Sequence, residues 1–463
     1  MNNREDYLPE GWRFGTDGIR GAVSSKMQPV FMTTVAMAAG RVLKEEGIKE
    51  VLIGKDTRIS GYMIESALQA GFISAGIDVV LLGPVPTPAV SFLTKQSKRK
   101  AYGLVISASH NTYLDNGIKL FNSKGEKISS SIEQRIEQYI LNLQNDGTKD
   151  FQVEDINFLG KASRLNEAQD LYIEFSKSRV PDLNLSKKTI VLDAANGANY
   201  KIAPKVFEDL GANVIKIACD PDGKNINENC GSTNPNYLSK KVMNYKADLG
   251  IAFDGDGDRL SMVDSKGRVL DGDDLMYLYL QNKENLETFR NGDGVVGTYM
   301  TNLSLESYLK KNKINFFRAE IGDKYVHSEL DKRGWTFGGE PSGHLMFLNE
   351  VASGDALVAS LKILDSIKKE DFMIEKLIND FTKLPQVMEN VDVKDPNLCL
   401  LDLTFLKALE QNEKKLNGSG RILIRPSGTE PVLRIMAEGE DKNLVEEIVK
   451  DLVDSTKDIN ISY

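Results

Sequence analysis

Residues 249–259 read Leu-Gly-Ile-Ala-Phe-Asp-Gly-Asp-Gly-Asp-Arg, a short apolar run followed by three aspartates that alternate with glycine. A short apolar run that ends in Gly/Asp turn residues predicts a strand buried on both faces of a sheet. The same pattern recurs at residues 51–54, 103–107, 189–193 and 294–297. Segments with helical spacing lie between these runs, at residues 65–75, 132–143 and 203–210. This alternation predicts an α/β protein whose sheets carry helices on both faces.

The chain has 463 residues, enough for about two to four domains. Three changes of pattern mark candidate boundaries: a polar stretch at residues 144–152, a turn at residues 265–268 and the segment at residues 383–386. After the last of these the pattern indicates a smaller α+β unit, with strands at residues 421–424 and 432–438 and a helix at 444–456. We expect three similar α/β mixed-sheet domains and a smaller C-terminal α+β domain, at residues 1–160, 161–264, 265–380 and 381–463.

Composition and charge exclude several classes of protein. Hydrophobic residues make up 41% of the chain and charged residues 27%, as is typical of folded globular proteins. The 58 basic and 67 acidic residues give a net charge of −9, which argues against a nucleic-acid partner. The least polar stretch, residues 79–94, carries three prolines and is shorter than the about 20 residues that a membrane-spanning helix needs. We therefore expect no membrane partner.

The N-terminal residues and the cysteines indicate the compartment. The first fifteen residues contain charges but lack the apolar core of a secretory signal. The three cysteines, Cys219, Cys230 and Cys399, are widely spaced and odd in number, which is typical of a reducing compartment. We expect a cytoplasmic protein.

The aspartates that follow the apolar run at residues 249–253 predict a metal site. Asp254, Asp256 and Asp258 alternate with glycines, so an extended loop can bring all three carboxylates to one point. Such carboxylates repel one another unless a hard dication lies among them, and oxygen ligands suit Mg²⁺. An EF-hand is excluded, because Arg259 and Ser265 occupy the positions that require Gly and Glu.

A second apolar run, residues 104–106, leads into a loop that contains Ser107, Ser109, His110 and Asn111. A serine acts as a nucleophile only when a neighbouring base or metal activates it. The neighbours of Ser109 do not form the G-x-S-x-G elbow of α/β-hydrolases. Taken alone, this pattern is better interpreted as a turn capped by serine and asparagine side chains.

Three further segments suggest groups that hold a phosphorylated sugar. In residues 425–434, Arg425, a glycine-containing turn and two hydroxyls make a phosphate cradle. In residues 338–344, Glu340 and Ser342 can bind sugar hydroxyls, and His344 can move a proton. In residues 14–21, Arg20 can fix a phosphate near the nucleophile. A hairpin turn is the competing interpretation of the first and last of these segments. Together, the motifs predict phosphoryl transfer on a phosphorylated sugar that is held at both ends.

These motifs resemble those of the α-D-phosphohexomutase family and occur in the family's order, over residues 12–450. The matching motifs are FGTDGIRG (14–21), SASHN (107–111) with DNGIK (115–119), DGDGDR (254–259), GGEPSGH (338–344) and RPSGTEP (425–431). The segments Tyr172-Ile-Glu-Phe, residues 193–200, and Val263-Asp with residues 269–273 are similar to the branch that acts on glucosamine phosphates. One departure is Thr112, which stands where the family usually has proline and removes one fixed φ angle from the loop.

The resemblance implies an enzyme of the isomerase class that interconverts glucosamine 6-phosphate and glucosamine 1-phosphate, for synthesis of UDP-N-acetylglucosamine and cell-wall precursors. Ser109 would be carried as phosphoserine. It would pass its phosphoryl group to the sugar's 1-hydroxyl and take back the 6-phosphoryl from a 1,6-bisphosphate that turns without leaving. Glucosamine or glucose 1,6-bisphosphate would be the intermediate and activator. Glucose or mannose phosphates are the alternative substrates within the same family. A homodimer is compatible with the resemblance.

The resemblance also assigns roles to residues. Mg²⁺, one per subunit, would lie on Ser109, Asp254, Asp256 and Asp258. Lys119 and His344 would be the acid and base, supported by His110, Arg20 and Arg259. Glu340 and Ser342 would bind the sugar, and the phosphate that is not reacting would lie on Arg425, Ser427, Gly428, Thr429 and Arg434. Because the motifs come from all four blocks, the four domains are expected to surround a central cleft, with the last domain hinging to exclude water.

Two other functions fit part of the pattern. An aspartate-nucleophile phosphatase begins its site with a strand and a DxD loop, but here Asp256 is followed by Gly257 and Asp258 rather than threonine. That interpretation also leaves residues 425–431 without a role. A catalytically silent sugar-phosphate sensor is the second alternative, and the presence of all the expected catalytic residues weighs against it.

Overall fold

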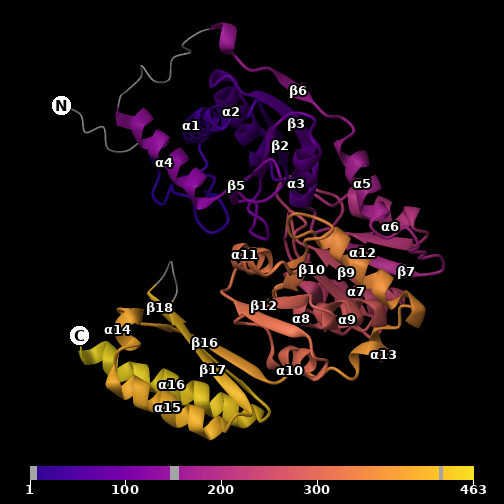
Figure 1. Cartoon of the computed structure of the whole chain (residues 1–463), viewed down its shortest axis with the longest axis vertical. Coiled ribbons are helices and arrows are strands. Elements are labelled where there is room, and N and C mark those ends of the chain that lie inside the picture. The colour runs from indigo at the N-terminus through magenta and orange to yellow at the C-terminus, as the bar shows by residue number, and fades with distance from the viewer. Residues whose placement is uncertain (1–7, 146–155, 427–430, 463) are drawn as a thin grey trace.

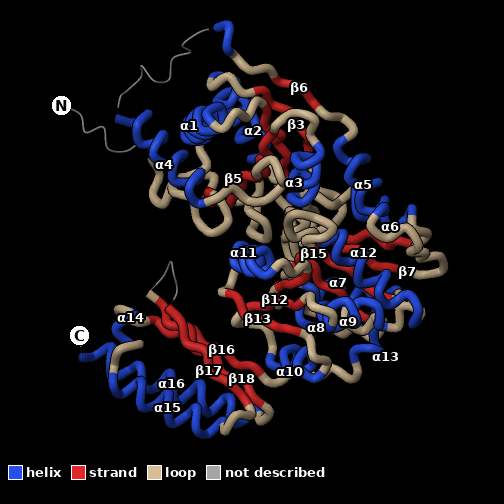
Figure 2. Tube along the Cα trace, in the orientation of Figure 1, coloured by secondary structure: helices blue, strands red, loops and turns tan. Residues whose placement is uncertain are grey.

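The computed structural model describes residues 8–145, 156–426 and 431–462. They form four sheets, three of them mixed or largely parallel within α/β layers and the last a small antiparallel sheet (Figures 1 and 2). The expected fold class, three α/β blocks followed by a smaller α+β unit, is confirmed. No helix within the described ranges is both long and apolar enough to cross a membrane.

The first domain is built on a six-stranded sheet. Its strand order is β1 (Ile19–Ala22), β5 (Asp115–Phe121), β4 (Ala101–Ile106), β2 (Glu50–Lys55), β3 (Asp78–Pro84) and β6 (Ala162–Arg164). Its helices are α1 (Pro29–Glu45), α2 (Ser60–Ser74), α3 (Thr87–Gln96) and α4 (Ser130–Asn145). The side chains of β2 alternate between two apolar clusters: Val51 and Ile53 pack in the cluster of α1 and α2, and Leu52 packs in that of α3. The sheet is therefore covered on both faces, as expected.

The second and third domains repeat this layering. The second sheet has the order β11 (Val269–Leu270), β10 (Leu260–Asp264), β9 (Leu249–Phe253), β7 (Thr189–Asp193) and β8 (Asn213–Ile217). It packs with α5 (Ala168–Ser178), α6 (Ile202–Asp209) and α7 (Pro235–Tyr245). The third sheet has the order β13 (Asn315–Ala319), β12 (Gly294–Thr298), β14 (Phe337–Gly339) and β15 (Leu345–Phe347). Its helices are α8 (Gly272–Tyr279), α9 (Lys283–Arg290), α10 (Leu303–Lys311), α11 (Asp323–Arg333), α12 (Ala356–Ile367) and α13 (Ile374–Ile378).

Two sheets extend past the ends expected from the sequence. β6 pairs with β3, so the first sheet reaches Arg164, beyond residue 160. The turn at residues 265–268 joins β10 to β11 in one antiparallel hairpin, so the second sheet reaches Leu270, beyond residue 264. β6 and β11 are therefore edge strands of the first and second sheets, and the next sheet begins after each of them.

The fourth domain is a separate body at the lower left of Figure 1. Its sheet has the order β16 (Gln386–Asp392), β18 (Val432–Gly439) and β17 (Gly420–Pro426), and its helices are α14 (Pro396–Cys399), α15 (Leu403–Leu416) and α16 (Lys442–Ser462). One continuous apolar cluster joins the first three domains, whereas the fourth has a cluster of its own. Polar contacts join it to the third domain: Arg421 donates to the carbonyls of Tyr299 (2.8 Å) and Thr301 (2.9 Å), and Glu438 accepts from the Leu303 amide (2.7 Å).

Candidate active site

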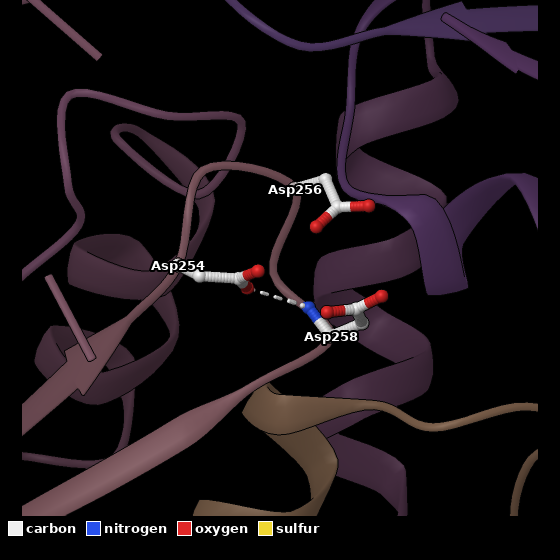
Figure 3. A group of neighbouring side chains, drawn as sticks. All are labelled: Asp254, Asp256 and Asp258. Carbon is white, nitrogen blue, oxygen red and sulfur yellow. Dashed lines mark hydrogen bonds between the residues drawn. The ribbon is translucent and has the colours of Figure 1, made fainter. Parts of the chain in front are cut away.

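The three aspartates converge at the end of β9, as the sequence predicts (Figure 3). One oxygen of Asp254 accepts the backbone N–H groups of Gly257, Asp258 and Arg259 at 3.0–3.1 Å, which winds the loop back on itself. Gly257 has φ +76°, a conformation that suits glycine. The buried carboxylates of Asp254, Asp256 and Asp258 each offer one oxygen, and these oxygens lie within 4.8 Å of one another.

The electrostatics of this cluster fit a bound cation. Burial, together with the charges of Asp258 and Asp256, raises the pKa of Asp254 well above its usual range. Burial also acts to raise the pKa of Asp258, but Lys119, His344 and Arg259 outweigh it and hold that pKa low. Within the described residues, one oxygen of Asp256 and one of Asp258 are buried without a hydrogen-bond partner. Closely spaced carboxylates with free lone pairs are the donor set that a hard divalent cation takes.

Ser109 lies directly against this cluster. Its side chain is buried, and its Oγ donates to the second oxygen of Asp254 at 2.6 Å. The same Oγ is 3.4 Å from Nδ1 of His110. Burial, followed by the charges of Arg259 and Arg20, lowers the pKa of His110 to about 4. The structure thus brings the serine of the first domain next to the aspartates of the second, the group of residues to which the family resemblance assigns the metal.

Lys119 supplies positive charge to the same point. It projects from β5 and is almost fully buried, with its Nζ 3.0 Å from Asp256, 3.2 Å from Asp258 and 3.2 Å from Asp17. Burial acts to lower the pKa of Lys119, but these three carboxylates raise it well above its usual value. A protonated ammonium therefore lies where the loops of two domains meet.

A chain of ion pairs continues from Lys119 toward the third domain. Lys127 lies 2.6 Å from Asp17 and 2.6 Å from Asp323, the first residue of α11. His344 lies between this chain of ion pairs and the loop that carries the three aspartates, with Nε2 3.8 Å from Asp323 and Nδ1 3.9 Å from Asp258. The expected residue Arg20 pairs with Asp17. The predicted acid–base candidates, Lys119 and His344, therefore flank the aspartate cluster on two sides.

The loop at residues 338–344 packs onto the second domain. Gly343 has φ +88°, and a Cβ there would lie 2.0 Å from the carbonyl oxygen of Leu260. Glu340 is buried and accepts the Gly322 amide at 2.9 Å, and burial raises its pKa. Ser342 is exposed. A buried carboxylate and an exposed hydroxyl at the edge of the site can both accept sugar hydroxyls.

The expected phosphate cradle lies on the fourth domain. Arg425 and Arg434 face each other in the register of β17 and β18. Burial and the charge of Arg434 lower the pKa of Arg425, and Nε of Arg434 has no hydrogen-bond partner within the described part of the chain. Ser427, Gly428 and Thr429 lie outside the described residues. Two paired arginines of this kind can bind an anion, and no contact between described residues joins them to Ser109.

Several polar residues of the site were missed in the sequence. Asp17, Lys127 and Asp323 form the ion-pair chain, and Thr87 donates to Asp256 at 2.7 Å. Arg58, in the loop after β2, is fully buried beside the Ser109 loop. One available signal was the segment Gly54-Lys-Asp-Thr-Arg. It forms the end of the buried strand β2 and the loop after it, and β4, the parallel neighbour of β2, leads into the loop of Ser109. The carboxyl ends of parallel strands meet at one edge of a sheet.

Comparisons with known proteins agree over most of the chain. Sequence models of the phosphoglucomutase/phosphomannomutase α/β/α domains I, II and III match residues 12–146, 170–267 and 271–384, and that of the C-terminal domain matches residues 388–455. Phosphoglucosamine mutase of Pseudoalteromonas translucida is 48% identical over 93% of this chain and 94% of its own. Phosphoglucosamine mutase of Cellvibrio japonicus is 48% identical over 95% of this chain and 97% of its own.

Solved structures show the same fold at lower identity. A phosphoglucomutase/phosphomannomutase family protein of Burkholderia thailandensis has a TM-score of 0.77 and 22% identity, covering 96% of this chain and 97% of its own. An N-acetylphosphoglucosamine mutase of Aspergillus fumigatus, solved with GlcNAc-6P and magnesium, has a TM-score of 0.68 and 16% identity, covering 99% of this chain and 97% of its own.

Proposed function

Because the chain belongs to the phosphoglucomutase/phosphomannomutase family, we propose that it is a phosphotransferase isomerase that interconverts glucosamine 6-phosphate and glucosamine 1-phosphate. The observation that carries this proposal is the contact of 2.6 Å between the Ser109 hydroxyl and Asp254, inside a buried cluster of three aspartates. The relatives named phosphoglucosamine mutase support the amino sugar as substrate.

In the proposed reaction, Ser109 carries a phosphoryl group on its Oγ. The 1-hydroxyl of glucosamine 6-phosphate attacks this phosphorus, so a bond from O1 to phosphorus forms while the bond to Oγ breaks. The proton of the hydroxyl passes to a base of the protein, for which His344 is the candidate. As it leaves, Oγ takes a proton from an acid of the protein, for which Lys119 is the candidate. The resulting 1,6-bisphosphate turns within the site. A bond from Oγ to the 6-phosphorus then forms while the bond to O6 breaks, the Oγ proton passes to the base, O6 takes a proton from the acid, and glucosamine 1-phosphate leaves. Positioning and electrostatics supply most of the catalysis in such transfers.

The charged residues of the site would hold the transferring group. Lys119 donates its ammonium at the point where two domains meet, and Arg20, Arg259 and His110 lie around Ser109 and the aspartate loop. Asp254, Asp256, Asp258 and the phosphoserine would hold Mg²⁺, which when bound neutralises negative charge on the phosphoryl group. Glucosamine or glucose 1,6-bisphosphate would load an unphosphorylated Ser109.

The rest of the substrate would be held by the third and fourth domains. Glu340 and Ser342 would bind sugar hydroxyls. The phosphate that is not reacting would lie on Arg425 and Arg434, with Ser427, Gly428 and Thr429. Paired guanidinium groups suit a phosphate dianion. The domain limits 1–160, 161–264, 265–380 and 381–463 stay predictions, with edge strands β6 and β11 lying past the first two limits. A homodimer and a cytoplasmic location also stay predictions.

The experiment compares purified wild-type protein with Ser109→Ala, and with Ser25→Ala as a control at an exposed serine of the same domain. Wild type and Ser25→Ala are expected to interconvert the two glucosamine phosphates, with phosphoserine at position 109 in the mass spectrum. Ser109→Ala is expected to lose turnover entirely. Normal rates in Ser109→Ala would overturn the mechanism, and net release of phosphate by that variant would favour a phosphatase. Comparison of kcat/KM for glucosamine, glucose and mannose 6-phosphates tests the sugar.

A further inference from the structure

The backbone of Ser109 is held in an unusual conformation. Its φ is +51°, in the left-handed region that non-glycine residues rarely adopt. A residue stays there only when its surroundings fix it, and such residues concentrate at functional sites. Glycine would adopt this conformation freely, but the reaction requires a hydroxyl at this position. The loop must therefore be fixed from outside.

Two side chains from different domains fix it. Arg58 of the first domain donates through Nη2 to the carbonyl oxygens of Ser109 (3.1 Å) and Asn111 (2.5 Å). Asn227 of the second domain donates through Nδ2 to the same two oxygens, at 2.9 Å each. Each carbonyl thus receives one donor from either side. The Ser109 amide in turn donates to Oγ of Ser107 at 2.9 Å.

The Arg58 side chain and the Asn227 backbone are themselves held in place. Arg58 is fully buried and ion-paired with Asp56, which also accepts the Ser107 hydroxyl. The Asn227 backbone has φ +59°, and its N–H donates to the Ala195 carbonyl at 2.9 Å. The aspartate loop covers this junction closely. A Cβ on Gly255 would lie 2.7 Å from Nδ2 of Asn227 and 2.7 Å from the carbonyl oxygen of Ser109.

We propose that Arg58 and Asn227 are positioning residues that together aim the Ser109 side chain at the aspartate cluster. This inference rests on the proposed function, because Ser109 is the phosphoryl carrier there. Asn227 is the more informative partner, since it ties the serine of the first domain to the domain that carries Asp254. Both hydrogens of its amide nitrogen are used, so a carboxylate in its place would direct lone pairs at two carbonyl oxygens.

The test uses single variants of the full chain, two at Asn227 and two at Asn229. Asn227→Gly keeps the left-handed backbone and removes the donors, whereas Asn227→Asp keeps the shape and replaces the donor nitrogen with oxygen. Asn229 is the matched control, because it has φ +55° in the same segment and is exposed. Asn229→Gly and Asn229→Asp therefore repeat both changes away from Ser109. Arg58→Lys adds a variant that keeps the charge but loses the planar fork.

Two readouts separate positioning from function. The first is hydrogen–deuterium exchange of residues 104–113, which is expected to be faster in both Asn227 variants and unchanged in both Asn229 variants. The second is steady-state kinetics with glucosamine 6-phosphate, where kcat is expected to fall about tenfold or more in the Asn227 variants while KM stays within about twofold. The fall in kcat is expected to be larger in Asn227→Asp than in Asn227→Gly.

The outcomes distinguish the two proposals. Wild-type exchange and wild-type kcat in both Asn227 variants would overturn the positioning role. A loss of kcat that occurs equally in the Asn229 variants would also overturn it. A third outcome combines faster exchange in the Asn227 variants with a wild-type protein that interconverts no hexose phosphate. It would support the positioning role of Asn227 and refute the proposed function.

Discussion

Replacement of Lys119 with methionine tests the electrostatics of the site most directly. The Lys119 ammonium is almost fully buried and lies 3.0–3.2 Å from the carboxylates of Asp17, Asp256 and Asp258. Removal of one partner of a buried ion pair costs about 3–5 kcal/mol, because the remaining charge is left without compensation. Asp17 keeps Lys127 as a partner, so the uncompensated charge falls on Asp256 and Asp258. We expect Lys119→Met to be less stable by about 3 kcal/mol in the absence of metal.

The assay is thermal unfolding in EDTA and in excess Mg²⁺. In EDTA the apparent Tm of Lys119→Met is expected to be lower than that of the wild type by about 3–4 °C. A cation that binds only the folded state at a concentration 100 times its Kd adds about 2.7 kcal/mol. The stabilisation by Mg²⁺ is expected to be larger in Lys119→Met than in the wild type, because the dication no longer competes with an ammonium for Asp256 and Asp258.

Lys55→Met is the matched control. Lys55 belongs to the same domain and forms a buried ion pair with Glu65 at 2.6 Å, and no contact between described residues joins it to the aspartate cluster. We expect it to lose stability in EDTA as Lys119→Met does, with the same gain from Mg²⁺ as the wild type. Equal gains in all three proteins would refute the idea that Lys119 and the metal share the aspartates. A Tm of Lys119→Met in EDTA equal to that of the wild type would refute the statement that Lys119 compensates the charges of Asp256 and Asp258.

Two further predictions concern the phosphate site proposed on the fourth domain and the pH dependence of stability. Arg425→Ala is expected to raise KM for glucosamine 6-phosphate by about 10-fold or more with a smaller change in kcat, since a hydrogen bond to a charged group contributes about 1.5–3 kcal/mol; a fall in kcat alone would contradict this. Burial raises the pKa of Asp355 to about 6, above the value of an aspartate in the unfolded chain. Between about pH 4 and 6 the folded protein therefore keeps a proton that the unfolded chain has lost, and about 3 kcal/mol of stability disappears as pH rises through that range. In unfolding measured from pH 4 to 7, Asp355→Asn is expected to lack this loss, and parallel curves for the two proteins would contradict the assignment.

Much of the fold could be predicted because its central strands are short apolar runs. Those at residues 189–193, 249–253 and 294–297 form β7, β9 and β12. The edges were harder to predict. β6 has three exposed residues, Ala162–Arg164, so its own sequence carries no sign of burial, and it is a strand only because β3 offers a free edge. β11 escaped notice for a similar reason, because two residues are too few to show alternation.

The site could be predicted where a motif directly follows a buried strand. Asp254 and Ser109 both do, and both lie in the cluster. The residues that join the domains carry no such signal. Asp17 was hidden inside a motif from which only Arg20 was selected, and Lys127 and Asp323 are single charges far apart in the chain. Their partnership depends on how whole domains pack, which no local pattern records.

The division of the apolar core suits a reaction in which the intermediate must turn. A bisphosphate can exchange its ends only if the grip on one phosphate loosens while the phosphoryl carrier keeps its place. Ser109 and Asp254 lie in domains that share one continuous apolar cluster, so their contact is fixed by extensive packing. Arg425 and Arg434 lie in a domain with a separate core, held to the third domain by the polar contacts of Arg421 and Glu438. Polar interfaces of this kind open more readily than packed cores, because water replaces the lost hydrogen bonds. In the proposed reaction, the second phosphate would therefore lie on a domain that can move without disturbing the contact of Ser109 with Asp254.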